Sequence, residues 1–135
     1  MKEMDRRSFI FTTGAVVASA ACVPVGAVTM EEKKMYGLIG KMTTVPGQRD
    51  AFIAILLEGI AEMPGCLSYV VAKDPTDANA LWITEVWESE ASHQASLSLP
   101  AVKQAIARGK PLIAGFSNGT VTEPVGGYGL GSAKK

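Results

Sequence analysis

One short stretch of the sequence, Leu81–His93, gathers most of the side chains that could do chemistry. It contains both tryptophans and the only histidine of the chain, with Glu85 between the two tryptophan positions. Histidine is the side chain whose unperturbed pKa lies near neutrality, so His93 could accept a proton from a weakly acidic hydroxyl group. Glu85 could assist as a second catalytic group, because the apolar residues on either side of it indicate that its carboxylate is not fully solvated.

Each of these side chains also has a purely structural interpretation. His93 could be a packed or surface residue of a helix, and Glu85 could pair within a sheet or across a dimer. Trp82 and Trp87 could belong to a core or a subunit interface instead of stacking on a substrate, and Tyr69 could supply a hydroxyl group to a pocket. We therefore take His93 and Glu85 as candidate catalytic residues, and Tyr69, Trp82 and Trp87 as candidate substrate-binding residues.

The composition argues against several other kinds of site. Three of the thirteen basic and two of the thirteen acidic residues lie in residues 1–27, so ten basic and eleven acidic residues follow, without a basic cluster. This balance provides no electrostatic surface for nucleic acid or for anionic lipid. One histidine and one cysteine, Cys66, remain after residue 27, too few for the usual zinc site or for an intramolecular disulfide.

The pattern of apolar residues predicts the elements that must position these side chains. Residues 35–45, 66–73 and 80–88 have the alternation of strands, and residues 120–122 indicate a short fourth strand. Apolar residues at helical spacing over 49–63 predict a helix ended by Pro64-Gly65. A second helix is expected from Ser89, a favourable N-cap, to about Leu99, and it resumes over 101–107 after Pro100.

The predicted order is β-α-β-β-α-β, which is typical of an α+β, ferredoxin-like fold with an antiparallel sheet and both helices on one face. The short loop between 66–73 and 80–88 predicts an antiparallel hairpin. The strands also carry apolar residues on their second face, for example Trp82 and Val86. We therefore expect a partner to cover that face, most simply a second copy of the chain.

Residues 1–27 have the features of an export signal. Arg6 and Arg7 precede an uncharged run, Phe9–Val25, that is rich in small residues, and the arginine pair is similar to that of a twin-arginine signal. The run is too short and too rich in alanine and glycine for a membrane span. We therefore expect export to a bacterial periplasm without a stable membrane anchor. A lead-in at 28–34, a folded domain at 35–124 and a glycine-rich tail at 125–135 would follow.

Several short motifs, taken in order, resemble those of the antibiotic biosynthesis monooxygenase family, in its small quinol-monooxygenase-like branch. They are Val45-Pro46-Gly47, Met63-Pro64-Gly65-Cys66-Leu67-Ser68-Tyr69, Lys73-Asp74-Pro75, Glu85-Val86-Trp87-Glu88-Ser89-Glu90-Ala91 and Ser98-Leu99-Pro100. The resemblance covers about residues 36–124. It implies a dimeric α+β barrel in which each subunit has a small apolar pocket between its own sheet and helices.

The resemblance also implies an activity. Members of the family oxidise polyphenols, anthrones or quinols with molecular oxygen, without a metal or a flavin. A deprotonated hydroxyaromatic can itself pass an electron to oxygen, so the protein need only bind it, take a proton and stabilise the anion. We therefore expect a cofactor-independent monooxygenase acting on a small aromatic substrate. The alternative is a non-catalytic dimeric module that binds a small ligand or serves a stress response. Ser96 stands where many members carry a histidine.

Overall fold

The computed structural model describes residues 34–130, so the expected export signal at 1–27 and nearly all of the lead-in at 28–34 lie outside the described residues. None of the helices within 34–130 is long and apolar enough to cross a membrane. The elements, in chain order, are β1 (Tyr36–Thr44), α2 (Arg49–Gly59), β2 (Cys66–Lys73), β3 (Ala80–Trp87), α3 (Glu90–Ser96), α4 (Pro100–Gly109), the 3-10 turn η2 (Lys110–Leu112) and β4 (Ile113–Thr122).

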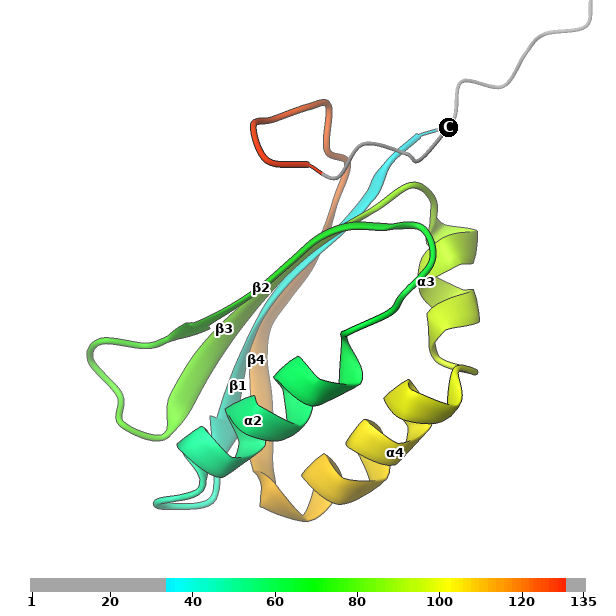
Figure 1. The fold of residues 1–135 in the computed structure, drawn as a ribbon. Coiled ribbons are helices and arrows are strands. Elements are labelled where there is room, and N and C mark those ends of the chain that lie inside the picture. Colours follow the sequence, from blue (N-terminus) through cyan, green and yellow to red (C-terminus); the bar gives the residue numbers. More distant parts are fainter. Residues whose placement is uncertain (1–33, 131–135) are drawn as a thin grey trace, which may run out of the picture. The chain divides into compact units, whose positions relative to one another are not determined.

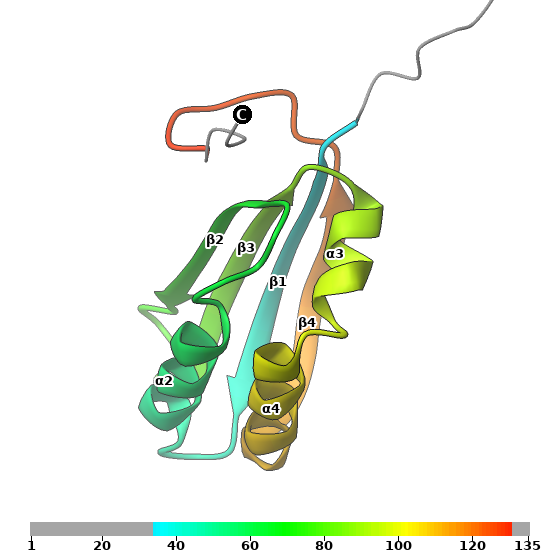
Figure 2. The same ribbon diagram turned by 45° about the vertical axis from the view of Figure 1, so that its right-hand side comes forward.

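The four strands form one sheet in the order β2-β3-β1-β4, and every neighbouring pair is antiparallel. The three α-helices all lie on one face of this sheet (Figure 1). Seen from the helical side, α2 and α4 lie next to each other, roughly along the strands, and α3 lies beyond the end of α4 (Figure 2). This arrangement confirms the expected ferredoxin-like α+β fold and the expected β2–β3 hairpin.

Strand register decides which side chains face the helices. Residues directly opposite each other in an antiparallel pair share a face of the sheet. Glu85 on β3 lies opposite Leu38 on β1 and Tyr69 on β2, while Trp87 lies opposite Tyr36. These residues therefore share one face, and it is the face toward the helices, because the same face carries the core residues of β3.

The core lies between α2 and the middle strands. Phe52 of α2 packs against Leu81 and Ile83 of β3, and all three side chains are buried. Two of the helices on this face, α2 and α4, also come close to each other. A Cβ at Gly59 of α2 would lie only 2.6 Å from the Cβ of Ala105 on α4. The small residue at this crossing lets α2 and α4 pack side by side while both cover the sheet.

Three elements differ from their predicted extents. The first helix ends at Gly59 and not at about residue 63, and Pro64 disfavours the helical conformation only at Met63, the residue directly before it. The second helix is two helices, because Pro100 occupies the first turn of α4 and starts a new segment. β4 is ten residues long instead of three: a register shift against β1 and the positive φ of Asn118 interrupt the alternation by which strands are recognised.

Candidate functional site

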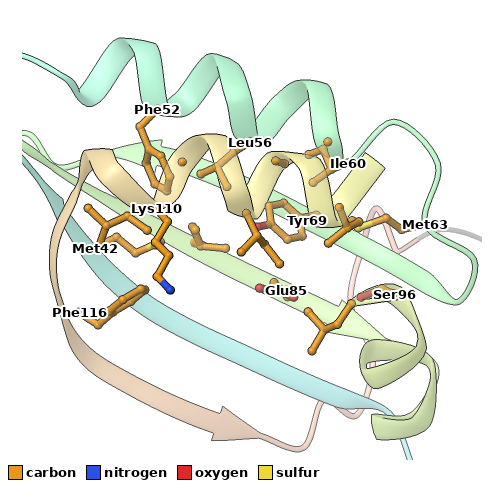
Figure 3. A pocket seen from close by; sticks show the side chains of 18 of the residues that line it. Met42, Phe52, Leu56, Ile60, Met63, Tyr69, Glu85, Ser96, Lys110 and Phe116 are labelled. Carbon is orange, nitrogen blue, oxygen red and sulfur yellow. The ribbon is translucent and has the colours of Figure 1, made fainter. Parts of the chain in front are cut away.

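A cavity of about 730 Å³ lies between the sheet and the helices (Figure 3). This volume falls within the range of about 300–1,000 Å³ found for small-ligand sites. Its wall is mostly apolar and combines side chains from α2, α3 and α4 with others from all four strands. The lining residues are Met42, Phe52, Leu56, Gly59, Ile60, Met63, Tyr69, Ile83, Glu85, Trp87, His93, Ser96, Leu97, Val102, Ala105, Ile106, Gly109, Lys110, Ile113, Ala114, Gly115 and Phe116.

The exposure of the lining residues distinguishes the floor of the cavity from its mouth. Phe52, Ile83 and Trp87 are buried and form the floor. Exposed apolar side chains of α3, α4 and β4 mark the mouth, and Phe116 is 73% exposed. A ligand would therefore enter beside α4 and β4 and reach inward towards β3.

Glu85 is the acidic group of the cavity. One carboxylate oxygen, Oε2, accepts a hydrogen bond of 2.8 Å from Nε1 of Trp87, two residues along the same strand. Among the described residues no donor bonds the other oxygen, which is thus available to a ligand. Burial raises the pKa of the Glu85 carboxyl above its ordinary value, while the Trp87 hydrogen bond and the nearby His93 act in the opposite direction.

His93 faces Glu85 from helix α3. Its Nε2 atom lies 3.9 Å from Oε2 of Glu85, and only 16% and 15% of the two side chains is exposed. That distance is too long for a direct hydrogen bond, but it allows one hydroxyl group of a ligand to approach both atoms. The other ring nitrogen, Nδ1, is buried without a hydrogen-bond partner among the described residues. Nε2 is therefore the ring nitrogen that faces Glu85.

Aromatic rings hold the imidazole in this position. The centroids of the Tyr36 and Trp87 rings each lie 5.4 Å from that of His93, the first tilted by 38° and the second nearly edge-on at 75°. Such tilted and edge-on contacts are the favourable geometries for aromatic rings. Trp87 thus contacts both members of the pair, bonding Glu85 with its N–H and packing its ring against His93.

Local structure at the start of α3 sets where His93 lies. The Ser89 hydroxyl accepts a hydrogen bond of 3.1 Å from the backbone N–H of Ser92, so Ser89 caps the helix as predicted. Gly65, with a φ of +83°, brings the preceding loop against this cap, and a Cβ there would lie 2.6 Å from Ser92. The turn predicted at Pro64-Gly65 therefore also positions the helix that carries His93.

Tyr69 lines the cavity next to Glu85. The two residues are opposite each other on β2 and β3. Burial, followed by the negative charge of Glu85, raises the pKa of the Tyr69 phenol well above its ordinary value. Its hydroxyl group therefore stays protonated over the physiological range, and it can donate a hydrogen bond to an anionic ligand.

Trp82 is not among the residues that line the cavity. Successive strand residues point to opposite faces, so Trp82 lies on the face away from Ile83 and Glu85. There its Nε1 donates a hydrogen bond of 3.0 Å to Asp74, and the Lys41 amine lies 5.7 Å from the centre of its ring. The structure thus places Trp82 in a polar cluster on the open face of the sheet, apart from the cavity, and its proposed substrate contact stays a prediction.

The structure brings together four of the five residues proposed from the sequence, namely Glu85, His93, Tyr69 and Trp87. Their catalytic and binding roles remain predictions. No group of three His, Cys, Asp or Glu side chains suitable for a metal ion occurs among residues 34–130. The expectation that the protein works without a cofactor stays a prediction.

Two polar lining residues were not proposed as site residues from the sequence, although Ser96 stands at a position where many family members carry a histidine. Ser96, one turn after His93, donates a hydrogen bond of 2.6 Å to the carbonyl oxygen of His93, and its helical spacing could have suggested a shared face. Lys110 follows α4, and no local pattern indicated that it belongs to a site.

A protein of known structure shares both this fold and much of this sequence. Residues 35–108 match the family model described as antibiotic biosynthesis monooxygenase. A solved structure from Chloroflexus aurantiacus J-10-fl, described as a candidate antibiotic biosynthesis monooxygenase, is 67% identical, with a TM-score of 0.71. That match covers 72% of this chain and 99% of the other.

More distant solved structures share the fold alone. One from Caulobacter crescentus CB15 is 21% identical with a TM-score of 0.58, covering 68% of this chain and 89% of that one. One from Nitrosomonas europaea is 14% identical with a TM-score of 0.62, covering 76% and 99%. Both carry the same candidate description. No curated protein matches the chain.

Proposed function

The chain belongs to the antibiotic biosynthesis monooxygenase family, and from this premise we propose that it oxidises a small quinol-like aromatic with molecular oxygen, without a bound cofactor. The observation that carries the proposal is the pair formed by Glu85 and His93 in the wall of an apolar cavity. Low exposure makes both groups effective in proton transfer, because little water competes for them. An aromatic substrate would be held by the apolar wall with one hydroxyl group at the pair.

The first step is removal of a proton from that hydroxyl group. Nε2 of His93 or the free oxygen of Glu85 takes it, and a raised carboxyl pKa makes Glu85 a stronger base than an ordinary glutamate. The protonated Tyr69 donates to the resulting phenolate and stabilises its charge. The electron-rich anion is then able to transfer an electron to oxygen.

The remaining steps use the electrons of the substrate. After one electron passes to O2, the semiquinone radical and superoxide combine through a new carbon–oxygen bond. The oxygen–oxygen bond then breaks, the distal oxygen takes up protons and leaves as water, and the ring carbon loses its hydrogen as a proton. For a hydroquinone, the sum is hydroquinone plus O2 giving hydroxyquinone plus water. The Glu85 and His93 pair supplies and recovers the protons.

We expect the protein to work as a homodimer. The face of the sheet away from the helices carries exposed apolar side chains, including Ile39 and Val70. The cavity lies on the opposite face. A second copy covering the open face would bury these apolar groups and leave the mouth of each cavity accessible.

Oxygen uptake tests the proposed activity. Purified protein is mixed with a panel of hydroquinones and anthrones in an oxygen-electrode cell, and the initial rate is compared with that of buffer. We expect Glu85→Gln and His93→Ala to lower the enzymatic rate by about a hundredfold or more, the usual size of general acid–base effects. Glu62→Gln changes an exposed glutamate outside the cavity and should leave the rate unchanged.

The outcome separates this activity from ligand binding alone. Folded protein that shows no rate above buffer with any member of the panel would contradict the proposal. If the same protein bound these aromatics tightly under anaerobic conditions, the non-catalytic module would be the better description. Full rates in both cavity variants would show that the pair does not transfer the proton.

A further inference from the structure

The cavity contains one lysine, Lys110, and it lies at a different position from the acid–base pair. Lys110 belongs to η2, the turn that leads from α4 into β4, and it is exposed at the mouth. Figure 3 shows its amine near the ring of Phe116, on the side of Glu85 away from Ser96. No ion pair involving Lys110 occurs among the described residues.

The register of the sheet separates the two polar positions. Glu85 lies opposite Leu38 on β1, whereas Phe116 lies opposite Met42. Four residues along a strand correspond to roughly 13 Å. Between these positions the wall is apolar and includes Ile83, which lies opposite Gly40 on β1. The cavity thus has a proton-transfer group at one end, an apolar middle and a cation at its mouth.

From this arrangement we propose that the cavity selects hydroxyaromatic acids: fused-ring compounds with the reactive hydroxyl group at Glu85 and His93 and a carboxylate at Lys110. The inference deepens the proposed function and rests on it for the hydroxyl end. A cation without an intramolecular partner gains from an anionic ligand group, and because Lys110 is exposed at the mouth, this gain is the modest one of a solvent-accessible ion pair.

The wall favours a flat ring system between the two polar ends. Phe52 and Phe116 line the part of the cavity on the Lys110 side, and Tyr69 and Trp87 line the part near Glu85. Aromatic side chains at both ends make offset or edge contacts with a ring ligand, which a flexible alkyl chain does not match. The acidic group then fixes the direction in which the ring system enters.

Binding without turnover tests this inference independently of the oxygenase activity. The quenching of tryptophan fluorescence is titrated with 6-hydroxy-2-naphthoate, which carries its hydroxyl and carboxylate at opposite ends, and with 2-naphthol, which lacks the acid. We expect the acid to bind more tightly than the neutral compound. Lys110→Met should weaken binding of the acid about three- to fivefold, as expected for a partly exposed ion pair, and leave 2-naphthol unchanged.

Two variants serve as controls. Lys110→Arg keeps the positive charge and should retain the preference for the acid. Lys103→Met removes an exposed lysine of α4 that does not line the cavity, so it should change neither affinity. Added salt should weaken the acid and not the neutral ligand.

Several results would overturn the proposal. They are an unchanged ratio of the two affinities in Lys110→Met, an equal effect of Lys103→Met, or no binding of either naphthalene by folded protein. Decanoate that binds as tightly as the naphthoate, with the same dependence on Lys110, would show selection of fatty acids instead. A preserved preference for the aromatic acid together with no oxygen uptake would sustain the binding inference while the proposed oxidation fails.

Discussion

At the scale of single residues, the site depends on a carboxylate whose surroundings disfavour its charged form. Glu85 is mostly buried in an apolar wall, and its hydrogen bond with Trp87 offsets only part of the lost hydration. A glutamate that served stability alone would be expected at the surface or in a close ion pair. Its position is instead suited to accepting a proton from a bound hydroxyl group.

This burial predicts how stability changes with pH. Because the pKa of Glu85 is higher in the folded protein, the folded state retains a proton that the unfolded chain releases. Below the unfolded pKa, Glu85 is protonated in both states and the folded protein has its full stability. As the pH rises through the folded pKa, burial of the charged carboxylate lowers the free energy of unfolding. We therefore expect Glu85→Gln, which cannot ionise, to become progressively more stable than wild type as the pH rises above the ordinary pKa of a glutamate.

Urea unfolding at several pH values measures this difference, with Glu62→Gln as the control at an exposed position. The control should show no such trend. A Glu85→Gln variant that becomes less stable relative to wild type as the pH rises would contradict the assignment of burial as the main cause. If Glu85→Gln is more stable than wild type and also less active, the wild-type carboxylate lowers the stability of the fold while it supports activity.

At the scale of elements, the short helix α3 determines where His93 lies. It has only seven residues, which is too short for a helix to be stable by itself, and it carries His93. The Ser89 cap, the contact with Gly65 and the rings around His93 hold it in place. The geometry of the site therefore depends on the capping of one short helix.

Removal of the cap should affect both stability and activity. Ser89→Ala deletes the acceptor for the backbone N–H of Ser92, and we expect a loss of about 1 kcal/mol in the free energy of unfolding. Fraying of α3 should also lower the oxidation rate of the folded variant. Ser89→Asp, another good cap, should restore both, and Ser98→Ala changes an exposed serine as a control. An unaltered unfolding midpoint in Ser89→Ala would show that packing alone holds α3.

At the scale of the whole molecule, the sheet has two unlike faces. The helical face holds the core and the cavity, while Val70, Thr84 and Ile39 lie side by side across the open face. Val70 is 52% exposed there, and Trp82 contributes part of its ring to the same face. An apolar patch of this kind on a central sheet is typical of a surface that binds a partner.

The expected homodimer can be tested on this face. We expect light scattering coupled to gel filtration to give a mass near twice the 14.2 kDa of the chain. Val70→Lys would place a charge in the interface, and its mass should fall to that of one chain at micromolar concentration. Leu57→Lys alters an equally exposed apolar residue of α2 and should remain dimeric. A monomeric wild-type protein would exclude this assembly.

The sequence by itself determined most of the fold. Periodicity is a local property, so alternation and helical spacing were enough to predict β1, β2 and β3 to within a residue or so, and to place Glu85 and Trp87 on one face. Turn and cap chemistry is also local, which is why Pro64-Gly65 and Ser89 were recognised. The length of β4 was missed, because its register shift and glycines remove the alternation.

Only the tertiary structure decided which of these residues form one site. Trp82 and Trp87 were equivalent candidates by residue type, and the packing of the helices on one face separates them. The 3.9 Å approach of His93 to Glu85 depends on the angle at which a capped helix leaves β3. Lys110 reaches the cavity because η2 joins the end of α4 to the start of β4, which pairs with β1. Such contacts join segments distant in the sequence, and no local pattern encodes them.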